Sequence, residues 1–314
     1  MGFLNRHYEK AGVGISKSAN KKTGSKLFFE LLGRKFWLLI GLNMLFTLFF
    51  APLPISLLCM STKLLSVKAS MIAVIALTLL FMVLIGPATA GMTEVLRKFT
   101  LEKHSFILSD FFSSFKKNFK YSAIIGFIDC LMVASCISGF FIYPKIAEIY
   151  GKIMYLCLAL VLSAGITIII MNFYIFPMIV ATDLSLSNII KNSFALACIA
   201  IKKNVITLFL NILIYGIFAF LCLINLTFLI VFPFLPTAIV SFINCFNCYP
   251  VIQKYVILGY YENKGEVNPE IADPSFDDVD SIFEDKGGSE SPSEIKKSEK
   301  VVENRKKPKG KIIS

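Results

Sequence analysis

The chain has 314 residues, of which 56% are hydrophobic, with a mean hydropathy of +0.70 and a formal net charge of +11. This composition is too apolar for an ordinary soluble domain, so we expect lipid to surround most of the chain. Residues 1–261 hold 22 Lys or Arg against 8 Asp or Glu, whereas residues 262–314 hold 10 against 13. Basic charge beside apolar segments favours membrane topology and anionic-lipid contact over nucleic-acid binding.

Residues 1–35 form a basic segment that we expect in the cytoplasm. Polar and basic residues extend as far as Lys35, and no short apolar stretch follows Met1. This pattern is not typical of a cleaved signal peptide, so the first apolar run is expected to stay attached.

Residues 36–261 contain six apolar runs, each long enough to cross a bilayer. The runs cover residues 36–59, 71–92, 121–143, 154–181, 205–232 and 235–257. Residues 233–236 are the only break between the last two runs, which predicts a hairpin with a tight turn. The predicted fold is therefore an all-α membrane domain of about six transmembrane helices. A five-span arrangement, which would put the C-terminal tail outside, is the alternative.

Lys and Arg in the connecting segments indicate the orientation, because short basic loops are retained in the cytoplasm. The N-terminal segment carries eight of them, the loop after the second run carries six and the loop after the fourth run carries three. The other connections between runs carry two or none. Both termini are therefore expected in the cytoplasm.

The two larger cytoplasmic loops are predicted to form amphipathic helices. In the first loop the apolar face comprises Leu108, Phe111, Phe112, Phe115 and Phe119, and the polar residues are Ser113, Ser114, Lys116, Lys117 and Lys120. In the second loop the apolar face comprises Leu186, Ile189, Ile190, Phe194 and Ala197, with Asp183, Ser185 or Ser187 as an N-cap. Each apolar face either packs on the bundle or lies on the membrane. The basic residues Lys116, Lys117, Lys120, Lys202 and Lys203 are candidate contacts for anionic lipid.

These loops also suggest an internal repeat. Pro87 is followed 29 residues later by Lys116-Lys117-Asn118, and Pro177 is followed 25 residues later by Lys202-Lys203-Asn204. Each unit would be a span, a surface helix and a second span, and Pro250 would belong to a truncated third unit. The alternative is that prolines and Lys-Asn pairs recur at helix ends by chance.

Residues 262–314 are rich in Glu, Asp, Ser, Pro and Lys, first acidic and then basic. We expect a disordered, charged cytoplasmic tail. Its apolar residues between 274 and 283 form either a short docking segment or part of a solvated tail.

The sequence shows no catalytic constellation, so we predict no enzyme, no cofactor and no metal site. His7 and His104 are too few for a zinc triad, and no Ser elbow, phosphate loop or dinucleotide motif occurs. Cys245 and Cys248 form a C-x-x-C pair inside an apolar run, where packing is favoured over metal or redox chemistry.

Asp129 is the most informative single residue, because it follows Lys120 by nine positions and so lies about 13 Å into the bilayer. A carboxylate at that depth must be protonated, paired or exposed to a wet cavity. The candidate partners are the amides predicted inside spans: Asn43, Asn172, Asn211, Asn225 and Asn244. The group serves either a structural hydrogen-bond network or a polar pathway.

Gly86 and Pro87, with Gly91, predict a bend in the second run and a close approach of another backbone. Pro177 predicts a similar bend in the fourth run.

Three runs of sequence carry a resemblance to a known family. GRKFWLLIGLN (33–43), GPATAGMTEVLRKF (86–99) and SDFFSSFKKNFK (109–120) together resemble the YesL-like family of bacterial integral membrane proteins, a domain of unknown function numbered 624. The resemblance covers roughly residues 27–125. It implies a multi-pass protein of the bacterial cell membrane, encoded near carbohydrate-uptake ABC transporters and polysaccharide-degrading enzymes. The long charged tail goes beyond the family pattern, and no Glu-Ala-Ala coupling loop of an ABC permease is present.

The leading functional hypothesis is a non-enzymatic accessory component of carbohydrate uptake, with an ABC transporter or another membrane subunit as partner. A secondary transporter or channel that uses Asp129 and the amides is the first alternative. A structural, membrane-organising protein that binds anionic lipid is the second.

Overall fold

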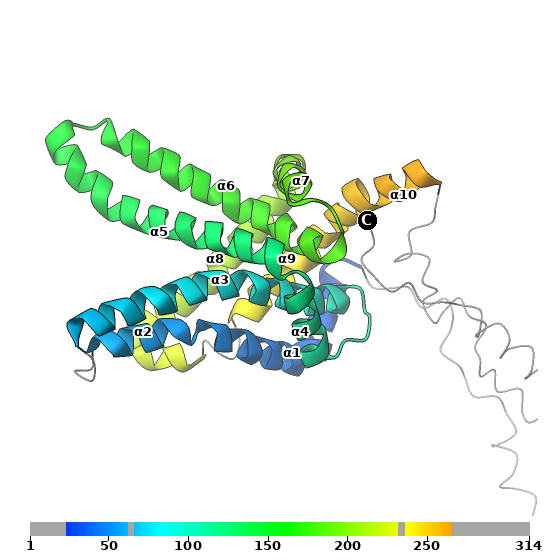
Figure 1. Ribbon diagram of the computed structural model, residues 1–314. Coiled ribbons are helices and arrows are strands. Elements are labelled where there is room, and N and C mark those ends of the chain that lie inside the picture. Colours follow the sequence, from blue (N-terminus) through cyan, green and yellow to red (C-terminus); the bar gives the residue numbers. More distant parts are fainter. Residues whose placement is uncertain (1–22, 62–65, 232–235, 266–314) are drawn as a thin grey trace, which may run out of the picture.

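The computed structural model describes residues 23–61, 66–231 and 236–265, and the regular structure of these residues is entirely helical (Figure 1). The helices are α1 (Ser25–Thr47), α2 (Pro52–Ser61), α3 (Val67–Thr100), α4 (Ile107–Lys117), α5 (Phe119–Tyr150), α6 (Met154–Ala181), α7 (Leu186–Ile199), α8 (Ile201–Ile224), α9 (Pro236–Ile252) and α10 (Leu258–Lys264). The all-α fold predicted from the sequence is confirmed.

Five helical segments among the described residues are long and apolar enough to cross a membrane. They are Ser25–Met60, which joins α1 and α2, and the helices α3, α5, α6 and α8. The bounds of α6 coincide with the predicted run, whereas α3 and α5 extend beyond theirs at both ends. Three predicted features lie largely outside the described residues. They are the turn at residues 233–236, the start of the N-terminal segment and the tail from residue 266. The sixth span therefore stays a prediction.

Helices α3, α6 and α9 form the centre of the bundle, and each contains an internal proline, as does α5 at Pro144. The prolines are Pro87 in α3, Pro177 in α6 and Pro250 in α9, and these three helices contact one another pairwise. The outer helices pack on them, with α5 against α3 and α6, α1 against α3 and α9, and α8 against α9. The order of span, surface helix and span occurs twice, as α3–α4–α5 and α6–α7–α8, and the internal repeat itself stays a prediction.

Helix α9 lies in both parts of the hydrophobic core. Cys248 and Tyr249 pack with the buried face of α6 and with α7. Ala238, Phe242 and Cys245 pack with α1, α3 and α4. The last predicted apolar run is thus a helix covered mainly by other helices, and it continues through a π-helical turn at Gln253–Ile257 into α10.

Glycines allow α3 to contact its neighbours at backbone distance. A Cβ atom added to Gly86 would overlap the carbonyl oxygen of Ser122 in α5, and one added to Gly126 would lie 2.6 Å from the Cα atom of Gly86. A Cβ atom on Gly91 would lie 2.9 Å from the carbonyl oxygen of Phe111 in α4. The close approach predicted for Gly86 and Gly91 is therefore present.

Helices α4 and α7 lie at one end of the bundle, where α3 and α6 end (Figure 1). We call it the basic end, because Lys116, Lys117, Lys120, Lys202 and Lys203 lie there and are all exposed. Burial concentrates toward this end, since the buried residues of α3 run from Gly86 to Phe99 and those of α6 mainly from Phe173 to Ala181.

Candidate functional site

Asp129 on α5 pairs with Asn172 on α6. The Asn172 side-chain amide donates a 2.8 Å hydrogen bond to a carboxylate oxygen of Asp129, and both residues are half-buried. Among the five predicted amides, Asn172 is therefore the partner of Asp129. The second amide atom, Asn172 Oδ1, is buried without a hydrogen-bond partner.

The other predicted amides serve different helix pairs. Asn43 Oδ1 on α1 accepts a 2.7 Å hydrogen bond from the Ala238 N–H near the start of α9. The Asn211 amide on α8 donates to Asn244 Oδ1 on α9 at 2.7 Å. Asn225 follows the end of α8, where its side-chain oxygen accepts from the Thr227 N–H. These bonds join α1 to α9 and α8 to α9, whereas Asp129 joins α5 to α6.

The helix-bend residues lie in the core. Gly86, Pro87 and Pro177 are buried, and both prolines lie inside continuous helices. They lie where α3 and α6 contact each other and α5, and the bends themselves stay a prediction.

The apolar face predicted for α4 is only partly correct. Phe111 is fully buried and Phe115 is half-buried, but Leu108, Phe112 and Phe119 are exposed. Ser114, predicted on the polar side, is buried and donates to the Ala90 carbonyl oxygen of α3 at 3.2 Å. The face of α4 that contacts α3 includes Ser114, because Gly91 has no side chain and Phe111 packs directly against it.

In α7 the residues that face the bundle are Ile189, Ser193 and Leu196, whereas Phe194 of the predicted apolar face is exposed. Ser185 is the N-cap residue, one of the three predicted, although its side chain makes no capping hydrogen bond. Asn204 at the start of α8 fixes the other end of this helix, because its amide donates to the carbonyl oxygens of Leu196 and Ala197.

A charged cluster that the sequence analysis did not single out lies at the basic end. Arg97 forms a bidentate ion pair with Glu94 one turn earlier in α3, and the two side chains are 13% and 15% exposed. Arg97 also donates to the Tyr249 hydroxyl of α9 at 3.2 Å. Lys98 contacts Asp110 of α4 at 2.8 Å. The cluster therefore ties α3 to α4 and α9.

Asp110 is held in its charged form within this cluster. Burial acts to raise its pKa, but hydrogen bonds from Lys98 and Ser105 and the positive charge of Lys98 outweigh it, so the pKa lies below its ordinary value. The sequence signal that could have revealed the cluster is Glu94 followed three and four residues later by Arg97 and Lys98, the spacing of helical ion pairs.

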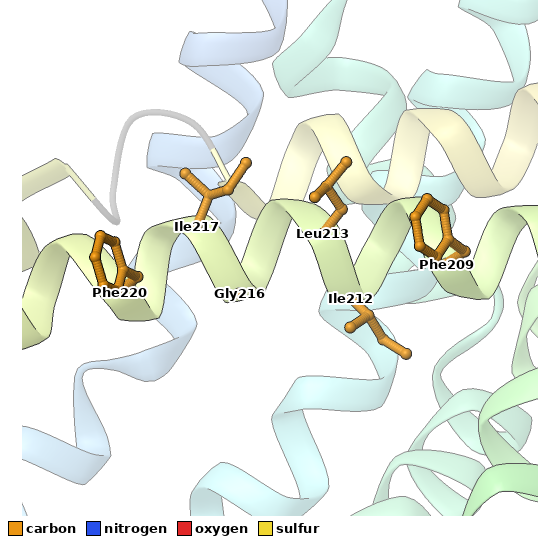
Figure 2. A pocket seen from close by; sticks show the side chains of 6 residues that line it. All are labelled: Phe209, Ile212, Leu213, Gly216, Ile217 and Phe220. Carbon is orange, nitrogen blue, oxygen red and sulfur yellow. The ribbon is translucent and has the colours of Figure 1, made fainter.

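The outward face of α8 carries a shallow apolar hollow of about 350 Å³ (Figure 2). It is lined by Phe209, Ile212, Leu213, Gly216, Ile217 and Phe220, all from one helix. With no polar side chain, this surface can take an acyl chain but offers no group for chemistry.

The cysteines of the C-x-x-C pair are both buried in α9 and are not joined by a disulfide. Among the residues that the structure describes, no group of three or more His, Cys, Asp or Glu is arranged to hold a metal ion.

The chain is an all-helical membrane protein, as its long apolar helices indicate. Residues 39–140 match the family model described as "Protein of unknown function, DUF624", so the predicted resemblance to the YesL-like family, which is this family, is confirmed. The matched segment runs from the second half of α1 into α5 and includes Asn43, Gly86, Pro87 and Asp129. No curated protein and no solved structure matches the chain.

Proposed function

We propose that the protein is a non-enzymatic accessory component of solute uptake in the bacterial cell membrane, with both termini in the cytoplasm. The solute class, carbohydrate, comes from the family resemblance. The partner in this proposal is an ABC transporter or another membrane subunit.

The observation that carries the proposal is a contrast between the interior and the surface: polar groups inside the bundle bond to one another, whereas one exposed surface combines apolar and basic side chains. Asp129 and the amides within the spans are engaged in separate helix pairs. The exposed face of the segment around α4, by contrast, combines Phe106, Leu108 and Phe112 with the exposed Lys116 and Lys117. Large exposed apolar side chains on one surface indicate a site for a partner, and the lysines lie at its edge.

The test is affinity purification in mild detergent, with and without residues 262–314, followed by identification of co-purified proteins. Leu108→Glu alters the exposed face of α4, and Phe194→Glu is the matched control on α7, since Leu108 and Phe194 are 63% and 54% exposed. A transporter subunit that is recovered with the intact protein and lost with Leu108→Glu or with the tail removed supports the proposal. Recovery of no transporter subunit from any form contradicts it.

The second candidate is a secondary transporter or channel in its own right. It is favoured by Asp129, an ionisable residue within an apolar helix that bonds to Asn172. Protein reconstituted in liposomes would then carry a solute flux that Asp129→Asn abolishes. Absence of flux for every tested sugar and ion counts against this candidate.

The third candidate, a membrane-organising protein, depends on the exposed lysines of the basic end. Its lipid association would weaken as salt rises, because exposed charges are screened. Association that is insensitive to salt counts against it.

A further inference from the structure

A cavity of about 550 Å³ lies at the basic end, between the first turn of α1, the end of α3, the first turns of α8 and the last turns of α9. Its walls are of two kinds. Leu27, Ile206 and Phe246 provide apolar surface, and Lys203, Asn247 and Gln253 provide polar groups. Helices α1 and α8 both pack on α9, and Ile206 is 57% exposed, so the apolar wall continues to the outer surface of the bundle.

Lys203 is the charged group of the cavity. It is exposed and has no ion-pair partner among the residues that the structure describes. The nearest cluster of charge is already balanced, because Arg97, which contacts the lining residue Tyr249, is paired with Glu94. A ligand of this cavity therefore meets one uncompensated positive charge.

The helix that forms the inner wall is irregular at this point. Pro250 lines the cavity and has no N–H to donate to the carbonyl oxygen of Phe246, four residues earlier. The π-helical turn Gln253–Ile257 begins one turn later, and such turns occur frequently at functional sites. The wall also carries the side-chain amides of Asn247 and Gln253, and the Asn247 amide nitrogen donates to Thr207 Oγ1 at 3.0 Å.

We propose that this cavity binds one anionic phospholipid from the surrounding leaflet. The phosphate contacts Lys203, hydroxyl groups of the headgroup meet the side chains of Asn247 and Gln253, and an acyl chain follows Leu27, Ile206 and Phe246 outward. Basic pockets between helices at the cytoplasmic side bind anionic headgroups on the same physical basis. A free organic phosphate shares the phosphate chemistry but cannot use the apolar wall.

The experiment is native mass spectrometry of the full-length protein, delipidated in mild detergent and titrated with phosphatidylglycerol or phosphatidylcholine. We expect one retained phosphatidylglycerol molecule, bound more tightly than phosphatidylcholine. Lys203→Gln should weaken its binding about fivefold, the effect of one lysine at a lipid headgroup. Lys202→Gln is the matched control, because Lys202 is also exposed but does not line the cavity.

A second pair of variants tests the apolar wall. Ile206→Trp should fill the cavity and lower phosphatidylglycerol binding, whereas Val205→Trp, at an equally exposed position outside the cavity, should leave it unchanged. If Lys202→Gln and Lys203→Gln weakened phosphatidylglycerol binding equally, the binding would reflect a general attraction between surface lysines and anionic lipid. That result would overturn the proposal. Displacement of the lipid by glycerol phosphate at the same concentration as by phosphatidylglycerol would also overturn it, in favour of a soluble phosphate ligand.

Discussion

At the scale of single residues, two ion pairs of the described bundle have the same 2.9 Å separation but different burial, which allows a direct comparison. Glu94 and Arg97 are 15% and 13% exposed, whereas Arg34 and Glu102 are 49% and 50% exposed. Without Arg97, the nearly buried Glu94 keeps only its 3.8 Å contact with Lys98, whereas removing one partner of the exposed pair leaves a solvated charge.

We therefore expect Arg97→Ala to lower the free energy of unfolding by about 3 kcal/mol. Arg34→Ala should lower it by less than about 1 kcal/mol. Thermal or denaturant unfolding in detergent measures both variants. If Arg97→Ala and Arg34→Ala lowered the free energy of unfolding by similar amounts, Arg97 would be more solvated than its burial indicates.

Asp110 predicts a pH dependence. Its folded pKa is depressed below the ordinary value of 3.8, so its contribution to stability is fully present above that value and is lost as the pH falls through the folded pKa. The unfolding temperature of the wild type should exceed that of Asp110→Asn at pH 7, and the difference should shrink below about pH 4. A difference that stays constant down to pH 3 would argue against the contact with Lys98.

At the level of residues, the sequence predicted an amide partner for Asp129, and the bond to Asn172 confirms it, but the sequence did not show which amide it would be. The depth of Asp129 follows from its distance along the chain from Lys120, and an amide partner follows from the cost of an isolated carboxylate. Which amide it is depends on the packing of α5 on α6, and the sequence left five candidates. The ion pair of Glu94 and Arg97 was not predicted, because nothing in the sequence shows that Tyr249 of α9 packs beside it.

At the scale of helices, the apolar runs gave correct positions, because a long apolar segment forms a helix whether lipid or protein covers it. For the same reason, the hydrophobicity of a run does not show whether lipid or other helices surround the helix. Helix α9 has the hydrophobicity of its neighbours, yet it lies in both parts of the core. The place of Ser114 on α4 was wrong for a related reason, since the face that contacts α3 depends on the contact between Gly91 and Phe111.

The crossing of α3 and α5 depends on Gly86, where a Cβ atom would overlap the backbone of Ser122. We expect Gly86→Ala to cost at least about 1–3 kcal/mol, as overpacking at a tight contact does. Gly216→Ala is the control in α8, because no other heavy atom would lie within 4 Å of its added Cβ. The control should be neutral or stabilising by up to about 1 kcal/mol. Unfolding temperatures in detergent compare the two, and a Gly86→Ala protein as stable as the wild type would rule out the close crossing.

At the scale of the whole molecule, burial is greatest toward the basic end, and the far parts of α3, α5 and α6 carry many exposed apolar side chains. This distribution fits a bundle that holds together near one membrane surface and contacts acyl chains elsewhere. With six spans, the basic end faces the cytoplasm and both termini lie there.

Green fluorescent protein fused after Ser314 should therefore fluoresce in a bacterial host, because it folds only in the cytoplasm. The same fusion after Asn225, which follows α8, should be dark. A dark fusion at Ser314 would support the five-span arrangement and would place the charged tail outside.

Carbohydrate uptake in a deletion strain, complemented with either wild type or Asp129→Asn, shows whether the protein assists uptake without forming the polar path itself. Deletion should lower uptake and both genes should restore it, because an Asn at position 129 still accepts the hydrogen bond from Asn172. Uptake unchanged by the deletion would contradict the accessory role. Uptake restored by the wild type but not by a normally folded Asp129→Asn protein would contradict the separation of Asp129 from the transport path.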